Sequence, residues 1–307
     1  MWVEQETIGG WAGNSAHMPW SLKMHGRGRA HPAMTAAVAL AVGALLLASA
    51  ARAEWPEPTT APAAAEKRAT RKPPGLSEPL VYLRDIDPSI LQDMRYAGAD
   101  NFTGRRVPGY GAAECVLLRD VAEALSRVQQ ALKSQQLSLK VYDCYRPRRA
   151  VRSFVGWVKD EVSGDDPLLK RFHPRIERKE LINLGYVAAV SRHSLGDTVD
   201  LTLVELPGPA SPPRFRRGVQ YGACTGPAKE RAPDTAVDMG TGYDCFDVLS
   251  HTNAAGITTT QRRWRKVLVD AMAAQGFRNY FREWWHFTMS RPHPGPSYDV
   301  PILPRRP

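Results

Sequence analysis

The sequence predicts an α+β fold, with a single domain in which helices pack on one face of a small, largely antiparallel sheet. Two segments repeat apolar residues every three or four positions, which is the spacing of a helix with one buried face. Short runs suited to β-strands come between and after these segments, an order typical of α+β domains. The chain has 307 residues, 43% of them hydrophobic, so it is long enough for one large domain or two small ones.

Both predicted helices carry a stripe of apolar side chains. The first spans 118–132, and the second spans 264–275 and stops at Gly276. Each stripe predicts a face turned toward the core and not toward a partner. The apolar positions are Leu118, Val121, Leu125, Val128 and Leu132 in the first helix, and Trp264, Val267, Leu268, Ala271 and Met272 in the second.

Three runs predict strands, over 137–142, 198–204 and 278–288. A stretch rich in Pro and Gly, 205–236, interrupts this pattern. It predicts a long surface excursion and not a second domain, and loops of this kind often form the rims of active sites.

The N-terminal part of the chain has the pattern of an export signal. Arg27 and Arg29 precede a short apolar run, 36–48, which an Ala-Arg-Ala site follows. These features predict a secretory signal peptide over 1–53, cleaved before Glu54, with an uncleaved N-terminal anchor as the alternative. The apolar run is too short to favour a permanent transmembrane helix. We therefore expect an exported protein that is periplasmic or extracellular.

The segments around this signal divide the rest of the chain. The residues before Met24 add nothing that a signal needs, so we expect an over-extended N-terminus and a true start at Met24 or Met34. Residues 54–79 are rich in Pro and Ala and predict a flexible linker. The folded domain is expected over 80–307.

Four cysteines, all beyond the signal, predict two disulfides in an oxidising compartment. Three pairings are possible. We favour Cys115 with Cys144 and Cys224 with Cys245, because each pair flanks one local unit. Zinc ligation by these cysteines is the competing interpretation, but no Cys-x-x-Cys spacing supports it.

The formal net charge of +10 raises the question of nucleic-acid binding. The basic residues are scattered along the sequence and are not interleaved with an aromatic platform. We therefore expect no nucleic-acid partner. The positive charge is better explained by electrostatic attraction of the protein to an anionic cell envelope.

The segment SRHSLGDTVDLTL, residues 191–203, points to a metal site. His193 and Asp200 lie on the two sides of a turn at Gly196, which brings an imidazole and a carboxylate toward one point. Asp200 continues into an apolar strand, where an aspartate is costly unless it is paired or bound to a metal.

A second segment, EWWHFT, completes the ligand set. His286 adds to His193 and Asp200 a third ligand and leaves a fourth tetrahedral position to water, as in a catalytic zinc site. Glu283 is then a carboxylate suited to take a proton from that water. Glu283 and His286 would point to opposite faces of an ideal strand, so we expect a bulge or strong twist there.

The segment VYDCYRPRRA contains a candidate catalytic arginine. Arg146 lies just past a predicted strand end, and Pro147 favours an extended conformation at this arginine. A guanidinium held in this way can polarise a scissile carbonyl and stabilise the oxyanion that develops on it.

These segments resemble the D-alanyl-D-alanine dipeptidases of the vancomycin-resistance type, within the zinc D,D-peptidases. The resemblance runs from about Leu80 to Ile302 and rests on five ordered motifs. They are RYAGADNFTG at 95–104 with the following Gly109-Tyr110, then YDCYRP, SRHSLGDTVDLTL, DMGTGYD at 238–244, and EWWH.

The resemblance implies one zinc ion per chain and the hydrolysis of free D-Ala-D-Ala. It assigns general acid–base catalysis to Glu283 and transition-state stabilisation to Arg146. It also places Asp244 at the substrate ammonium group and Ser191 near its carboxylate. The implied metal ligands are His193, Asp200 and His286, and Tyr96, Tyr110 and Asp143 match positions that line the pocket.

Two features depart from the family pattern. The excursion after Asp200 is longer than in the compact resistance enzymes, and the four cysteines differ from cytoplasmic relatives. The alternative enzymatic function is a zinc carboxypeptidase or endopeptidase acting on peptidoglycan. A non-catalytic wall-binding module is a further alternative, which would be expected to lose Glu283 or a metal ligand.

Overall fold

The computed structural model describes residues 79–161, 168–290 and 295–305, and these belong to one compact unit. The predicted signal peptide, and the linker up to residue 78, lie outside the described residues. Within the described ranges, no helix combines the length and the apolar character needed to cross a bilayer.

The central sheet has five strands in the order β2-β4-β5-β7-β6. Only the pairing of β2 with β4 is parallel, which confirms the prediction of a largely antiparallel sheet. A second, two-stranded antiparallel sheet pairs β1 (Leu80–Tyr82) with β3 (Val116–Leu118). The strands of the central sheet are β2 (Leu91–Gln92), β4 (Leu137–Asp143), β5 (Thr198–Glu205), β6 (Phe277–Asn279) and β7 (His286–Met289).

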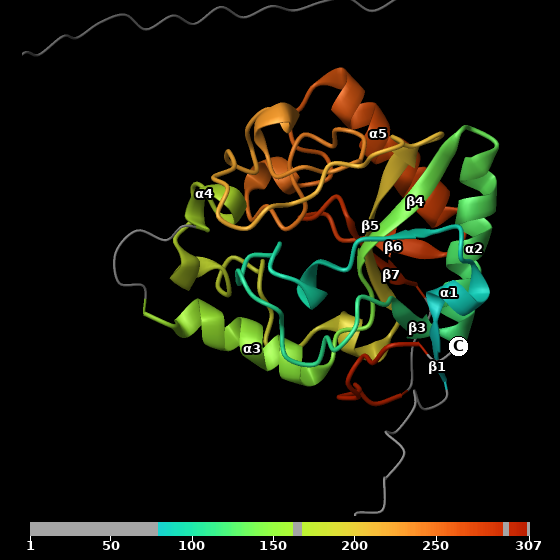
Figure 1. Ribbon diagram of the computed structural model, residues 1–307, viewed down its shortest axis with the longest axis horizontal. Helices are drawn as coiled ribbons and strands as arrows, with labels where there is room; N and C mark the ends of the chain where they lie inside the picture. The colour runs from blue at the N-terminus through green and yellow to red at the C-terminus, as the bar shows by residue number, and fades with distance from the viewer. Residues whose placement is uncertain (1–78, 162–167, 291–294, 306–307) are drawn as a thin grey trace, which may run out of the picture. The chain divides into compact units, whose positions relative to one another are not determined.

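Two long helices cover one face of this sheet, as the apolar stripes predict. Helix α2 (Arg119–Lys133) packs on β4 and on α5 (Thr259–Ala273), which also contacts β5 and β6 (Figure 1). Thr258 and Gln261 form a reciprocal capping box that fixes the start of α5. The α+β class is therefore confirmed, with a single helical layer on this face.

The third long helix, α3 (Arg148–Lys159), was not predicted. It lies on the other side of the sheet from α2 (Figure 1), and its Phe154 and Trp157 pack in an aromatic cluster around Phe102. Two one-turn helices, α1 (Leu83–Ile86) and α4 (Leu169–Phe172), complete the α-helices of the described residues. Phe154 of α3 lines a cavity together with Asp200 of β5 and His286 of β7.

The run over 278–288 is not one strand, so this prediction is wrong. The structure divides it into β6 and β7, an antiparallel pair joined by a turn. Backbone hydrogen bonds from Glu283 to Tyr280 (N to O, 3.0 Å) and from His286 to Glu283 (3.2 Å) close this turn. Glu283 therefore precedes the strand that begins at His286, and the predicted bulge is absent because a turn already aims both side chains inward.

The excursion over 205–236 runs along the surface with little regular structure. Beyond the end of β5, its one described element is a 3-10 turn, Ala228–Glu230. Disulfides join Cys115 to Cys144 and Cys224 to Cys245, which confirms the favoured pairing. The second disulfide ties the excursion to the segment that bears Asp244.

Candidate active site

Adjacent strands place three functional side chains side by side. Asp200 on β5 pairs directly with Asp143 on β4 and with His286 on β7. Side chains of directly opposed residues lie about 5 Å apart and point to one face of a sheet. The register of the sheet therefore sets an aspartate between a second carboxylate and an imidazole.

A tight turn brings His193 to the same place. The 3-10 turn Arg192–Leu195 ends at Gly196, whose φ is +76°. A Cβ at Gly196 would come within 2.8 Å of Leu80 Cδ2, so both the conformation and the space require glycine. The Ser191 hydroxyl accepts a hydrogen bond from the His193 amide (3.3 Å) and caps the turn. This confirms the predicted turn at Gly196.

The donor atoms of His193, Asp200 and His286 fit a tetrahedral cation. Asp200 Oδ1 lies 3.3 Å from His193 Nε2 and 3.1 Å from His286 Nδ1, and the two nitrogens are 3.3 Å apart. Ligands about 2.0–2.1 Å from a tetrahedral zinc ion lie about 3.4 Å from one another. The three distances thus match three edges of a zinc coordination tetrahedron.

Hydrogen bonds around these donors leave them available for a cation. His193 Nδ1 lies 2.7 Å from the Cys144 carbonyl oxygen, so Nδ1–H donates there and the lone pair of Nε2 faces the site. Asp200 Oδ1 is buried and has no hydrogen-bond donor among the described residues. A buried carboxylate oxygen left in this way is costly without a cation.

Glu283 lies beside this ligand set. Its Oε2 is 3.4 Å from His286 Nδ1, and the side chain is 11% exposed. Burial raises the pKa of Glu283 to about 8, and the negative charge of Asp200 adds to the shift. A carboxyl group with such a pKa can both accept and return a proton near neutral pH.

Arg146 is held over the site by Asp143. Its Nε and Nη2 each lie 2.9 Å from Asp143 Oδ2, and Nη2 lies 3.6 Å from Asp200 Oδ2. The Tyr110 hydroxyl donates to the other Asp143 oxygen (2.6 Å). Tyr110 and Asp143 are not among the residues that line the cavity, which differs from the expectation. Their contacts orient Arg146 from behind.

Asp244 occupies a strained position and has no cationic partner. Its φ of +56° is uncommon for a residue other than glycine. The Tyr96 hydroxyl donates to Asp244 Oδ2 (2.8 Å), and no ion pair to Asp244 occurs within the described part of the chain. Burial raises the pKa of Asp244 well above its ordinary value, and the nearby Asp200 raises it further.

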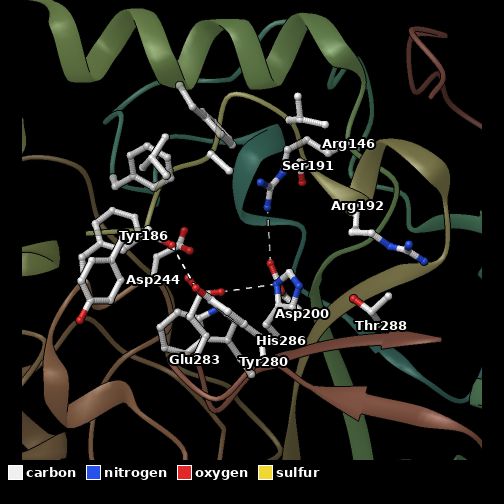
Figure 2. Close-up of a pocket in the computed structure, with 18 of the residues that line it drawn as sticks. Arg146, Tyr186, Ser191, Arg192, Asp200, Asp244, Tyr280, Glu283, His286 and Thr288 are labelled. Carbon is white, nitrogen blue, oxygen red and sulfur yellow. Dashed lines mark hydrogen bonds and ion pairs between the residues drawn. The ribbon is translucent and has the colours of Figure 1, made fainter. Parts of the chain in front are cut away.

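Seven of the predicted residues line a cavity of about 400 Å³, whereas His193, Tyr110 and Asp143 are not among its lining residues. Figure 2 shows Asp200, His286 and Glu283 at its centre, with Asp244 on one side and Ser191 and Arg192 on the other. The opposed placement of Asp244 and Ser191 suits a ligand with a charged group at each end. The predicted residues that line the cavity are Tyr96, Arg146, Ser191, Asp200, Asp244, Glu283 and His286.

One residue at the metal site was missed from sequence. The Tyr243 hydroxyl donates to Asp200 Oδ2 (3.0 Å). The motif DMGTGYD contained a signal for this residue, because Tyr243 directly precedes Asp244 there. Only the carboxylate of Asp244 was assigned a role from the sequence. An aromatic residue there is equally typical of packing, so sequence alone did not distinguish the two.

Comparisons with known proteins agree with this geometry. The sequence model of a peptidase family described as "D-ala-D-ala dipeptidase" matches residues 77–211 and 225–303. The chain is 36% identical over 222 residues to the D-alanyl-D-alanine dipeptidase of Streptomyces coelicolor, covering 72% of this chain and 96% of that protein.

The dipeptidases of two enterococci are similar to a comparable degree. Those of Enterococcus faecium and Enterococcus faecalis are each 33% identical to this chain, across 72% of it and 96% or 97% of their own lengths. The family match leaves out 212–224, which lies within the surface excursion. From these matches and the site above, the chain belongs to the D-alanyl-D-alanine dipeptidase family of metallopeptidases.

Proposed function

We propose that this protein is a zinc-dependent dipeptidase that hydrolyses D-alanyl-D-alanine in the cell envelope. The observation that carries the proposal is the set of three donor atoms on His193, Asp200 and His286, spaced as zinc ligands and placed beside Glu283. The names of the similar dipeptidases support this choice of substrate.

His193, Asp200 and His286 are the residues that would hold the metal. When bound there, Zn²⁺ would polarise the scissile carbonyl and lower the pKa of a water molecule. Glu283 takes a proton from the attacking water as the C–O bond forms. The same carboxyl group then returns that proton to the leaving amine as the C–N bond breaks.

Arg146 supplies a positive charge that can stabilise the transition state. Its guanidinium faces the cavity while Asp143 holds its Nε and Nη2. It can donate to the oxygen that becomes negative when water adds to the carbonyl. Because Asp143 already holds Arg146 before the substrate binds, the guanidinium needs little reorganisation during the reaction.

Asp244 would select free dipeptides. A dipeptide presents an ammonium group to this buried carboxylate, whereas a longer peptide has a neutral amide at the same position. Placing an amide there would leave the buried carboxylate of Asp244 without a cationic partner. The free-energy penalty for such a buried group is larger than that for a poorly made contact at the surface. Ser191, on the other side of the cavity, would lie near the carboxylate of the dipeptide.

Export is part of the proposal. Two disulfides and the predicted signal over 1–53 support an oxidising compartment, and the periplasm is the expected location. N-terminal sequencing of protein recovered from the envelope checks this point. Glu54 as the first residue would support it, and an intact upstream segment would indicate the uncleaved anchor.

The decisive experiment compares two substrates with and without a chelator. Purified protein should release D-alanine from free D-Ala-D-Ala, and far more slowly from a pentapeptide ending in D-Ala-D-Ala. Removal of the metal should abolish activity, and Zn²⁺ should restore it. Faster cleavage of the pentapeptide would indicate the carboxypeptidase alternative, and metal-independent activity would contradict the proposed chemistry.

A further inference from the structure

The two oxygens of Asp200 have different surroundings. Oδ1 faces the imidazoles of His193 and His286, whereas Oδ2 points away from them and accepts a hydrogen bond from Tyr243 (3.0 Å). The other donor near Oδ2 is Arg146 Nη2, at 3.6 Å, beyond hydrogen-bond distance. Among the described residues, Tyr243 therefore makes the hydrogen bond to the oxygen of Asp200 that faces away from the ligand set.

We propose that Tyr243 is a positioning residue that holds Asp200 as a metal ligand through Oδ1 alone. This inference rests on the proposed metal site and adds to it a residue outside the three ligands. By occupying Oδ2, the hydroxyl fixes the rotation of the carboxylate. It thereby sets how tightly the site binds its cation.

The proton of Tyr243 has one good acceptor. Besides Asp200 Oδ2, the hydroxyl lies 3.4 Å from the Tyr96 hydroxyl. Tyr96 gives its own proton to Asp244, at 2.8 Å. A carboxylate is a stronger acceptor than a neutral hydroxyl and here is also closer, so Tyr243 donates to Asp200.

Packing fixes the ring that bears this hydroxyl. Tyr243 stacks on Tyr142 with ring centroids 4.5 Å apart and an interplanar angle of 16°, and Trp285 meets it edge-on at 5.5 Å. The Tyr142 hydroxyl bonds to Asp234 (2.8 Å), and the disulfide at Cys245 constrains the chain two residues beyond Tyr243. Loss of the hydroxyl would therefore leave the ring in place and remove its short hydrogen bond to Asp200 and its longer contact with the Tyr96 hydroxyl.

The expected effect follows from the role of outer partners in metal sites. Groups that orient a ligand typically contribute a factor of about 10–100 to metal affinity or activity. Without the Tyr243 hydroxyl, Asp200 can rotate, or Oδ2 can move toward Arg146. Either change weakens the alignment of Oδ1 with the two imidazole nitrogens.

The test compares two variants of the stacked pair, Tyr243→Phe and Tyr142→Phe. Each removes one hydroxyl from a buried ring of the same stack, but only Tyr243 contacts a metal ligand. Zinc affinity is measured for the full protein by competition with a chromophoric chelator. Near-ultraviolet circular dichroism and thermal unfolding of the metal-free proteins report whether the fold is retained.

We expect Tyr243→Phe to raise the dissociation constant for zinc about 10–100-fold, while Tyr142→Phe binds zinc like the wild type. Equal weakening in both variants would overturn the inference, because it would indicate general loosening of the stack. Unchanged affinity in Tyr243→Phe would also overturn it. A wild-type protein without zinc affinity would instead refute the proposed function, which this experiment identifies separately.

Discussion

Asp234 accepts a hydrogen bond from Tyr142 and Asp244 accepts one from Tyr96, yet the pKa values of these two aspartates are shifted in opposite directions. Loss of hydration would raise the pKa of Asp234, but Arg95 and Lys140 hold it at about 2. The pKa of Asp244 rises well above its ordinary value, because burial and the charge of Asp200 outweigh the opposing effects of the Tyr96 hydrogen bond and the more distant Arg146. The difference lies in the partners of each carboxylate and not in the carboxylates themselves.

The same contrast holds for the clusters around these two residues. In the described part of the chain, the cluster at Asp234 has as many cationic as anionic side chains, and its ion pairs link all of them. The cluster at the cavity, counted with Asp143 behind Arg146, has four carboxylates and one arginine. The first comprises Asp93, Asp100, Asp234, Arg95, Lys140 and Arg171, and the second comprises Asp143, Asp200, Asp244, Glu283 and Arg146.

This imbalance is consistent with the proposed binding of external cations at the cavity. Balanced charges neutralise one another within the protein, so the cluster at Asp234 stabilises the fold and anchors the excursion to the sheet. Under the proposed function, a metal ion and a substrate ammonium group would offset the cost of the excess carboxylates at the cavity. A deficit of positive charge in a buried cluster is thus a sign of function, whereas charge density alone is not.

The largest expected effect comes from removing a charge from the unbalanced cluster. Glu283→Gln keeps the volume of the side chain but cannot transfer protons, so turnover should fall about 10²–10⁴-fold. Bound zinc, measured by atomic absorption, should stay at the wild-type level, because Glu283 is not a ligand. Unfolding should require as much denaturant as in the wild type. Loss of the metal would instead identify Glu283 as a ligand.

A smaller effect is expected at the substrate end of the same cluster. In Asp244→Asn, kcat/KM for D-Ala-D-Ala should fall at least about 30-fold, since losing one partner of a buried charge pair costs about 2 kcal/mol or more. An N-acetylated dipeptide, which lacks the ammonium group, should be affected much less. The preference for free over acetylated dipeptide should therefore shrink. An unchanged preference would contradict the assignment of Asp244 to the ammonium group.

The smallest effect on activity is expected in the balanced cluster. Asp234→Asn should leave turnover close to the wild type but lower the free energy of unfolding by about 1–2 kcal/mol at pH 7, a value discounted because the side chain is 25% exposed. Asp85→Asn, which breaks an exposed pair with Arg305, is the control and should change stability less. A marked fall in turnover of Asp234→Asn, without a lower free energy of unfolding, would contradict a structural role for Asp234.

The difference in the free energy of unfolding between the wild type and Asp234→Asn should depend on pH with a defined sign. The pKa of Asp234 is about 2 in the folded chain, below its ordinary value of 3.8. A lowered carboxyl pKa stabilises the fold above the ordinary value, and that contribution is lost as the pH falls toward 2. Denaturant unfolding at pH 7 and between pH 4 and 2 should therefore show the Asp234→Asn variant converging on the wild type.

The sequence by itself determined the parts of this protein that local patterns encode. The apolar spacing of α2 and α5 follows from the period of a helix, and it places their core faces without knowledge of the rest of the chain. Asp200 stood out because an aspartate in an apolar strand is costly unless it is paired or bound to a metal. The local spacing of the four cysteines favoured one of three possible pairings, and the structure has that pairing. The sequence also predicted His193, His286 and Glu283 as site residues, from the chemistry of an open metal site together with the family resemblance.

Only the tertiary structure decided how these residues are supported. The bond from Tyr96 to Asp244 joins residues 148 apart, and the bond from Tyr243 to Asp200 crosses 43 residues. No local period records such contacts, which is why the turn at Glu283 and the bond from Tyr243 were not predicted. Helix α3 is a different case, because its buried Val151, Phe154 and Val158 have helical spacing and the pattern was overlooked. Sequence patterns select side chains for a face or a chemistry, whereas hydrogen bonds between distant segments fix the atoms that meet.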